Sequence, residues 1–169
     1  KGEDHPVYLM KPFYYSNGLP DFSSVKAVFE QVESLISQGR VLSCWTLGAG
    51  GAAEGIMKMM LGNQIGFELD KTFNENELFA QCYGAFLCEL DKPLEMPGSA
   101  ILLGHTTKGY SLKTGSATIQ MDKLQKIYED KLQPVFPYLS QEEEKPVQTF
   151  SYACANPAKA AFKTAKPHV

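Results

Sequence analysis

The residues best suited to chemistry form a glycine-rich stretch, Gly48-Ala49-Gly50-Gly51, between an apolar run and a helical pattern. Glycine lets the backbone turn sharply, and the N–H groups at the start of a helix carry partial positive charge. Such a turn can bind phosphate through main-chain donors. The stretch lacks the Gly-Lys-Ser/Thr of a P-loop and the spacing of a dinucleotide-binding fingerprint. A tight connection that only packs a helix on a sheet is therefore an equally good interpretation.

Some charged and aromatic side chains near this stretch are weaker candidates for ligand contact. Glu54 falls in the first turn of the expected helix, where the helix dipole alone favours an acid. Lys108, with Lys113 in the same expected hairpin, could meet a phosphate, although most such lysines are simply solvated. Trp45, the only tryptophan, ends the expected strand before the turn, and core packing is its default explanation.

The histidines and cysteines form no recognisable catalytic or metal-binding set. We expect His5 and His168 to be solvated and His105, which follows an expected strand, to be structural. The four cysteines lie in or beside apolar segments without a CxxC pair, which indicates buried free thiols; they are Cys44, Cys82, Cys88 and Cys154. The residues therefore predict neither a catalytic group nor a metal ligand.

Hydrophobic spacing predicts helices and strands that alternate at first, followed by a group of strands. The expected strands are 7–10, 41–46, 65–69, 84–90, 99–104 and further strands within 107–119. The expected helices are one capped by Ser23 or Ser24 and stopped by Gly39, one over 52–62, a short one after Asn74, and one over 121–132. The expected inner face of the first helix consists of Val25, Val28, Phe29, Val32, Leu35 and Ile36. That of the last helix consists of Leu124, Ile127, Tyr128 and Leu132. This order predicts an α/β (α+β layered) fold with helices packed on a mixed β-sheet.

Composition narrows the class of protein. The chain has 169 residues, 44% of them hydrophobic, and a formal net charge of −3, which is typical of one globular domain with a sizeable core. The acidic balance argues against general nucleic-acid binding, which usually needs a basic face. No apolar run approaches the roughly 20 residues of a membrane span, so no membrane partner is expected. Cysteines without an evident disulfide pattern favour a cytoplasmic location.

The glycine stretch also resembles a motif of the aminoimidazole ribonucleotide synthetase superfamily. In the C-terminal domain of these proteins, forms such as His-Asp-x-Gly-Ala-Gly-Gly-Leu precede a helix, and residues 41–56 are similar. Three further segments follow in the family's order: 78–86, 99–105 and 124–137. The last of these looks like the helix that ends such domains in the phosphoribosylformylglycinamidine synthases. Taken together, the chain resembles the last synthetase-type C-terminal domain of the large single-chain form.

This resemblance implies a function. Phosphoribosylformylglycinamidine synthases convert formylglycinamide ribonucleotide to its amidine in purine biosynthesis, with ATP, magnesium and ammonia drawn from glutamine. Residues 1–150 would then be the synthetase C-terminal-type domain, and the Ala- and Lys-rich stretch 151–169 a linker leading toward an absent glutaminase domain. The expected partners are the other domains of the same polypeptide and a phosphorylated small-molecule substrate.

One departure from the family pattern limits what this domain could do by itself. Trp45 and Thr46 stand where the family has its His-Asp pair, so the acid that could assist metal or nucleotide chemistry is missing. We therefore expect the isolated chain to be inactive and to require no cofactor. Alternatives are a C-terminal domain like that of selenophosphate synthetase or thiamine-monophosphate kinase, or a purely structural module without ligand contact.

Overall fold

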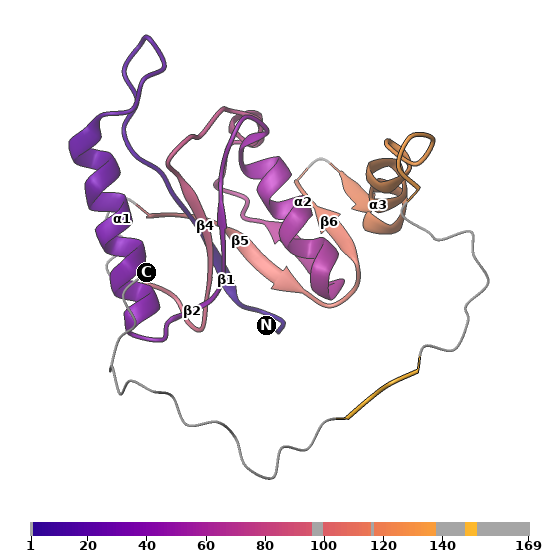
Figure 1. Ribbon diagram of the computed structural model, residues 1–169. Helices are drawn as coiled ribbons and strands as arrows, with labels where there is room; N and C mark the ends of the chain where they lie inside the picture. Colours follow the sequence, from indigo (N-terminus) through magenta and orange to yellow (C-terminus); the bar gives the residue numbers. More distant parts are fainter. Residues whose placement is uncertain (1, 96–99, 116, 138–147, 152–169) are drawn as a thin grey trace, which may run out of the picture. The chain divides into compact units, whose positions relative to one another are not determined.

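The structure is a computed structural model that describes residues 2–95, 100–115, 117–137 and 148–151. Residues Lys1–Phe136 form a compact unit that contains all the helices and strands below. In chain order these are β1 (Pro6–Met10), α1 (Phe22–Ser37), β2 (Val41–Thr46), α2 (Gly51–Asn63), β3 (Gly66–Leu69), the 3-10 helix η1 (Glu75–Glu77), β4 (Phe86–Leu90), β5 (Ala100–Thr107), β6 (Ser111–Lys113), β7 (Thr118–Gln120) and α3 (Met121–Asp130) (Figure 1). The expected linker lies outside the described residues from residue 152 onward, so the boundary at 150 stays a prediction.

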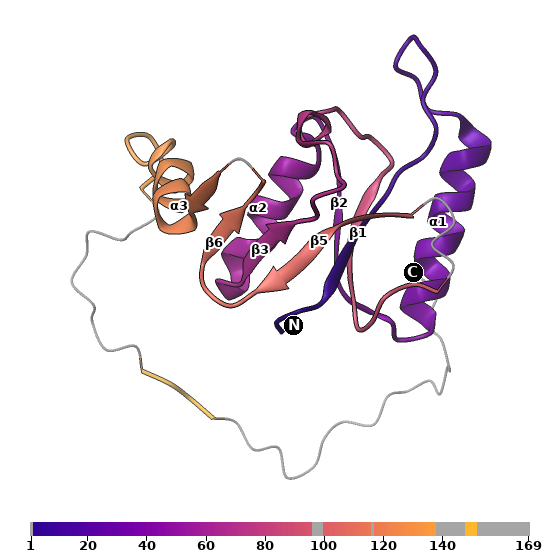
Figure 2. The same cartoon turned by 180° about the vertical axis from the view of Figure 1, so that it is seen from behind.

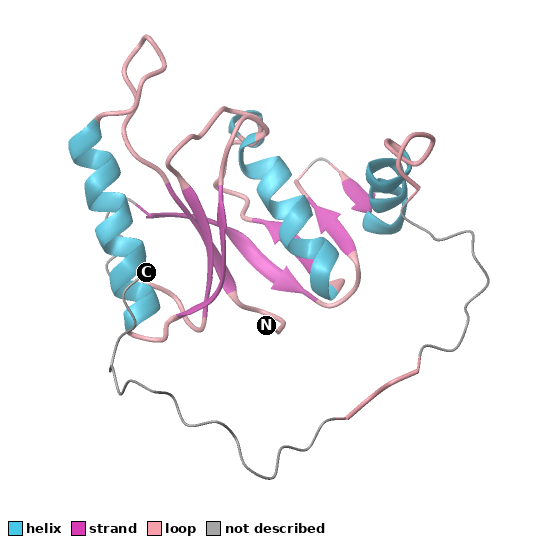
Figure 3. Ribbon diagram, in the orientation of Figure 1, coloured by secondary structure: helices cyan, strands magenta, loops and turns pink. Residues whose placement is uncertain are grey.

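The strands form one mixed seven-stranded sheet in the order β2-β4-β1-β5-β3-β6-β7. The described pairings are antiparallel except for that of β3 with β6, which is parallel. The layered fold with helices on a mixed sheet is therefore confirmed (Figure 3). The strand predicted over 99–104 extends to Thr107, because this strand pairs with both β1 and β3.

Each face of the sheet is covered by one helix. Successive side chains of a strand point to opposite faces. In β1, Val7 and Leu9 pack with α2 in one cluster, whereas Tyr8 and Met10 pack with α1 in another. Figures 1 and 2, which view the molecule from opposite sides, show the strands lying between α1 and α2. Burial on both faces explains why β1 reads as a continuous apolar run rather than as an alternation.

Helix α1 confirms the predicted amphipathic helix but corrects its cap and the width of its buried face. Asp21 caps the helix, since its carboxylate accepts a hydrogen bond from the Ser24 N–H at 2.8 Å. The cap is therefore neither Ser23 nor Ser24. Phe29 and Ile36 are exposed, at 50% and 54%. They flank the apolar stripe, whose buried centre is Val28, Val32 and Leu35. Phe29 still packs edge-to-face on Phe86 of β4, with ring centroids 5.0 Å apart.

Helix α3 departs more from expectation. It ends at Asp130, and the residues predicted to face inward, Ile127, Tyr128 and Leu132, are exposed at 69%, 48% and 60%. The helix follows the short strands β6 and β7 at the end of the sheet order and is anchored by Met121, which is fully buried. Within the described residues, the start of this helix therefore packs on the core, whereas its later apolar side chains, Ile127 and Tyr128, are exposed.

Candidate functional site

The glycine stretch forms the connection from β2 to α2. Gly51 has φ +62°, a backbone conformation that side-chain-bearing residues rarely adopt. A Cβ atom at Gly51 would lie 2.4 Å from the carbonyl oxygen of Ala80 and 2.7 Å from that of Leu78. Only glycine therefore fits at this position, because backbone from a distant part of the chain presses against it.

Hydrogen bonds fasten the turn to the same distant segment. The Gly48 carbonyl accepts from the N–H groups of Gly51 at 3.2 Å and Cys82 at 3.3 Å, and the Ala53 N–H donates to the Leu78 carbonyl at 2.9 Å. The short helix predicted after Asn74 is a single 3-10 turn, η1, and it leads into this segment. Part of the glycine content therefore serves packing, as the structural interpretation requires.

Ala49 is the exposed residue of the turn, whereas Gly51 and Ala52 are buried. The N–H of Gly50 donates to Oε2 of Glu54 at 3.2 Å, and Lys58 Nζ donates to Oε1 of Glu54 at 2.5 Å. The ion pair with Lys58 and, to a lesser extent, the Gly50 N–H hold the pKa of the Glu54 carboxyl below its usual value. A carboxylate of the chain itself thus already engages one of the predicted anion donors.

Trp45 lies beside this pair of charges. Its side chain is 38% exposed, and Lys58 Nζ stands 5.7 Å from the ring centroid, within the range of a cation–π contact. Core packing is the default explanation for Trp45. The structure shows that only part of this residue is packed in the core and that the rest is exposed to solvent.

The predicted lysines do not join the turn. Strand register places Thr46 beside Phe86 and Met10 at one end of the sheet, whereas Thr107 pairs with Gly66 at the other end. Lys108 directly follows Thr107, and its side chain is 83% exposed and lies 3.2 Å from Glu3. Lys113, the other lysine of the hairpin, lies 3.8 Å from Glu68. Contact of either lysine with a phosphate held at the turn has no support in this arrangement.

A buried polar cluster on the α2 face of the sheet was missed by the sequence reasoning. Glu89 of β4 is only 5% exposed. Its Oε2 accepts a hydrogen bond from Ser43 Oγ at 2.5 Å, and its Oε1 lies 2.9 Å from His5 Nδ1. His5, expected to be solvated, is therefore half-buried and paired, and its backbone N–H donates to Thr106 Oγ1. The available signal was an acid inside an otherwise apolar strand.

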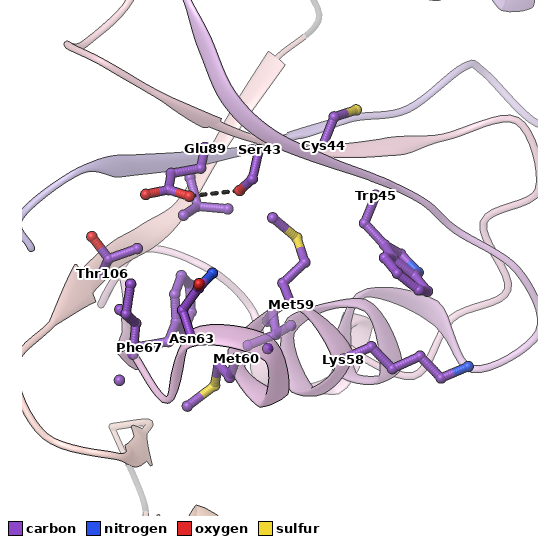
Figure 4. A pocket seen from close by; sticks show the side chains of 15 residues that line it. Ser43, Cys44, Trp45, Lys58, Met59, Met60, Asn63, Phe67, Glu89 and Thr106 are labelled. Carbon is purple, nitrogen blue, oxygen red and sulfur yellow. Dashed lines mark hydrogen bonds between the residues drawn. The ribbon is translucent and has the colours of Figure 1, made fainter. Parts of the chain in front are cut away.

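This cluster borders a cavity of about 220 Å³ between α2 and the sheet. Figure 4 shows Glu89 and Ser43 on the strand side, and Met59 and Asn63 of α2 opposite them. The rest of the lining is mainly apolar, with Ile56 and Phe67 among the residues that contribute. The polar lining includes the hydrogen-bonded side chains of Ser43 and Glu89. Trp45 and Lys58, which lie beside the glycine turn, also line this cavity.

The residues present do not suit magnesium. Among the described residues, no group of three or more His, Cys, Asp or Glu side chains could hold a metal ion. Near the turn, Glu54 is engaged by Lys58, and Trp45 and Thr46 offer no carboxylate.

His105 borders a separate hollow with Asp70, whose pKa is lowered chiefly by hydrogen bonds from Thr72. Within the part of the chain that the structure describes, no helix is long and apolar enough to cross a membrane.

Comparison with known proteins identifies the fold. No protein-family model and no curated protein sequence matches the chain, but solved structures do. The chain has the fold of one part of phosphoribosylformylglycinamidine synthase. A Thermotoga maritima PurL structure complexed with ADP matches 89% of this chain at a TM-score of 0.56 and 11% sequence identity. Phosphoribosylformylglycinamidine synthase II from the same organism matches 90% at a TM-score of 0.53 and 12% identity.

A third match is T. maritima PurL complexed with FGAR, with a TM-score of 0.52 and 10% identity over 92% of this chain. The resemblance inferred from the glycine motif is thus confirmed at the level of the fold. The chain spans only 28% to 31% of the lengths of these three PurL chains. It corresponds to a domain-sized part of such proteins.

Proposed function

We propose that the chain is the C-terminal-type synthetase domain of a phosphoribosylformylglycinamidine synthase. The fold match, combined with a glycine motif placed between β2 and α2, carries this proposal. In the whole enzyme ATP would phosphorylate the formyl amide oxygen of formylglycinamide ribonucleotide, and ammonia from glutamine would then displace the phosphate. The isolated 169 residues would supply no catalytic group, and a cytoplasmic location would accompany purine biosynthesis.

The part of the domain in this function would be to hold a phosphate group at the turn formed by Gly48, Ala49, Gly50 and Gly51. The exposed position of Ala49 and the start of α2 favour an anion there. To reach the N–H of Gly50, the phosphate must displace the Glu54 carboxylate, which can stay paired with Lys58. Glu54 therefore acts as an internal competitor, and Lys58 supplies the positive charge that the sequence reasoning assigned to Lys108.

Exposed aromatic side chains around the turn support contact with another domain of the same polypeptide. Phe13, Phe79 and Tyr83 are exposed at 64%, 75% and 56%. The ring of Tyr83 borders Gly48, the main chain of Phe79 borders Gly51, and the Tyr83 carbonyl accepts a hydrogen bond from the hydroxyl of Tyr14, the neighbour of Phe13. Large exposed apolar side chains that gather in one place are typical of an interaction surface. An N-terminal-type synthetase domain covering this surface would enclose the turn.

A second candidate function is a purely structural module. The close approach of residues 78–80 to Gly51 favours it, because the glycines are then explained without a ligand. A domain of a selenophosphate synthetase or thiamine-monophosphate kinase would share the superfamily but act on a different substrate.

Phosphate titration of the 169-residue chain, followed by Trp45 fluorescence, separates the binding and structural candidates. Ala49→Asp places a negative charge at the exposed position and should weaken phosphate binding at least about tenfold, while Ala49→Asn should bind like the wild type. A saturable change lost only in Ala49→Asp supports the phosphate site. If Trp45 fluorescence shows no saturable change with phosphate in either the wild type or Glu54→Gln, the structural module is the better description.

The enzyme assignment is tested separately. A purine-requiring strain that lacks the synthase should grow without purines when it receives the gene of the whole proposed enzyme of which this chain would be one domain, and should not grow when that gene carries Ala49→Asp. The purified 169 residues, given ATP, formylglycinamide ribonucleotide and ammonium, should form no amidine. Measurable turnover by that preparation contradicts the expected inactivity of the isolated chain, whereas failure of the expressed whole gene to restore growth contradicts the enzyme assignment.

A further inference from the structure

Cys44 and Cys88 face each other across neighbouring strands. The register pairs Cys44 of β2 with Cys88 of β4, and their Sγ atoms lie 3.6 Å apart. Both are free thiols, and Cys44 is exposed, contrary to the expectation of buried cysteines, whereas Cys88 is fully buried. In Figure 4 the side chain of Cys44 points away from the face of β2 that carries Ser43 and Trp45.

The backbone geometry suits a covalent bond between these two residues. Residues directly opposite each other in antiparallel strands have Cα atoms about 4.5 or 5.5 Å apart, and disulfides bridge Cα atoms about 4.4 to 6.8 Å apart. The sulfur atoms need only close from 3.6 Å to about 2 Å. Rotation of the two side chains can supply this movement while the strands stay paired.

The two thiols differ in exposure and in pKa, which suits Cys44 to react first and Cys88 to close the disulfide. The two sulfur atoms share a hydrogen bond in which either can be the donor, and this contact with Cys88 holds the pKa of Cys44 below its usual value. The same hydrogen bond and burial raise the pKa of Cys88. The exposed sulfur therefore carries more thiolate and meets solutes from solvent, and the buried sulfur is shielded from them. Cys82, the other described thiol, is buried in the α2-side cluster.

We propose that Cys44 and Cys88 form a redox-active pair that a hydroperoxide converts to an intramolecular disulfide. With hydrogen peroxide, the Cys44 thiolate attacks one peroxide oxygen and becomes a sulfenic acid as the O–O bond breaks, and the hydroxide that leaves takes up the proton that the Cys44 thiol had released and becomes one water. The sulfur of Cys88 then attacks the sulfenic sulfur, the S–S bond forms, and the hydroxyl departs as a second water with the Cys88 proton. The two thiols lose two electrons and two hydrogens, and the peroxide is reduced to two waters.

The disulfide would tie the outermost strand of the described sheet to its neighbour. Strand β2 is first in the sheet order and pairs only with β4 in that sheet. It ends at Thr46, directly before the glycine turn. Oxidation would therefore restrain the strand that leads into this turn, without touching the α2 face on which the Ser43–Glu89 cluster lies.

The test uses the reduced 169-residue chain and equimolar hydrogen peroxide. Denatured free thiols should fall from four to two, and chymotryptic peptides, separated at Tyr83 and Phe86, should link Cys44 to Cys88 rather than to Cys82. The oxidised chain should stay monomeric on a non-reducing gel. Its thermal unfolding temperature should rise, and dithiothreitol should reverse the rise.

Three variants serve as controls. Cys82→Ser should form the same disulfide as the wild type. Cys88→Ser should stop at a sulfenic acid on Cys44 that dimedone labels, and Cys44→Ser, at an exposed position, should form no disulfide and show no thermal shift even if Cys88→Ser does not fold. A wild-type chain that accumulates dimedone-labelled Cys44 without the link, or that links Cys82, Cys154 or a second chain instead, overturns the proposal.

Discussion

The carboxylate of Glu54 accepts a hydrogen bond from the backbone N–H of Gly50 at 3.2 Å. An acid of α2 thus reaches back four residues to the turn from which its own helix begins. The contact caps the helix with a negative charge, which the N-terminal dipole favours. It also places that charge where an external anion would otherwise bind.

Removal of this charge should strengthen anion binding at the turn. In Glu54→Gln the side chain keeps its shape, but no longer repels phosphate, so the affinity for phosphate should rise about two- to fivefold. Trp45 fluorescence during phosphate titration measures the change. Glu30→Gln, at an exposed site on α1, is the matched control and should leave the affinity unchanged. Weaker binding by Glu54→Gln would show instead that Glu54 itself contacts the ligand.

Substitution of Gly51 should destabilise the fold. Gly51→Ala brings a Cβ within 2.4 Å of the Ala80 carbonyl oxygen in a left-handed conformation, which should lower the free energy of unfolding by about 2 to 4 kcal/mol. Urea denaturation followed by circular dichroism measures it.

The matched control for that substitution is Gly62→Ala in the same helix. A Cβ at Gly62 meets nothing within 4 Å, and alanine favours a helix, so this variant should gain about 0.5 to 1 kcal/mol. Equal effects of the two alanines would contradict the steric role of Gly51.

The buried acid Glu89 should contribute strongly to stability. Glu89→Ala leaves Ser43 Oγ and His5 Nδ1 without their carboxylate partner, and should cost about 2 to 4 kcal/mol of the free energy of unfolding. The exposed pair of Lys26 and Glu30 offers the comparison, because Glu30→Ala should change stability by less than about 0.5 kcal/mol. Chemical denaturation of the two variants measures the loss in the free energy of unfolding. If Glu89→Ala loses as little as Glu30→Ala, the polar cluster is solvated rather than buried.

The cap of α1 should make stability depend on acidity. The Ser24 N–H and, to a lesser extent, the Tyr15 hydroxyl lower the pKa of the Asp21 carboxyl in the folded chain. A folded-state pKa below the unfolded value contributes stability that is present above the unfolded pKa and lost as pH falls through the folded pKa.

Asp21→Asn keeps a capping oxygen but cannot ionise. The wild type should therefore unfold at a higher temperature than Asp21→Asn at neutral pH, and the difference should disappear once the pH drops below the folded pKa of Asp21. Thermal melts at a series of pH values measure this. A difference that stays constant with pH would show that charge is irrelevant to the cap.

The positions of most helices and strands could be predicted, because they follow from the local spacing of hydrophobic residues. Periods of two and of three to four residues located the main strands and helices, and Asn74 does cap the turn that follows it. The inward face of α3 was wrong for Ile127, Tyr128 and Leu132. Periodicity shows that a helix has an apolar stripe, but only the neighbouring elements determine whether something covers it.

For the site, the sequence by itself determined the glycine turn, its place between a strand and a helix, and the absence of an acid at Trp45 and Thr46. Only the tertiary structure decided which side chains meet. Glu54 accepts a hydrogen bond from Gly50, Glu89 contacts Ser43 and His5, and the sulfur of Cys44 lies next to that of Cys88. The last two groups join residues 44 to 84 positions apart. Such pairs arise from strand order and register, which depend on how distant segments of the described sheet pack together and leave no local pattern in the sequence.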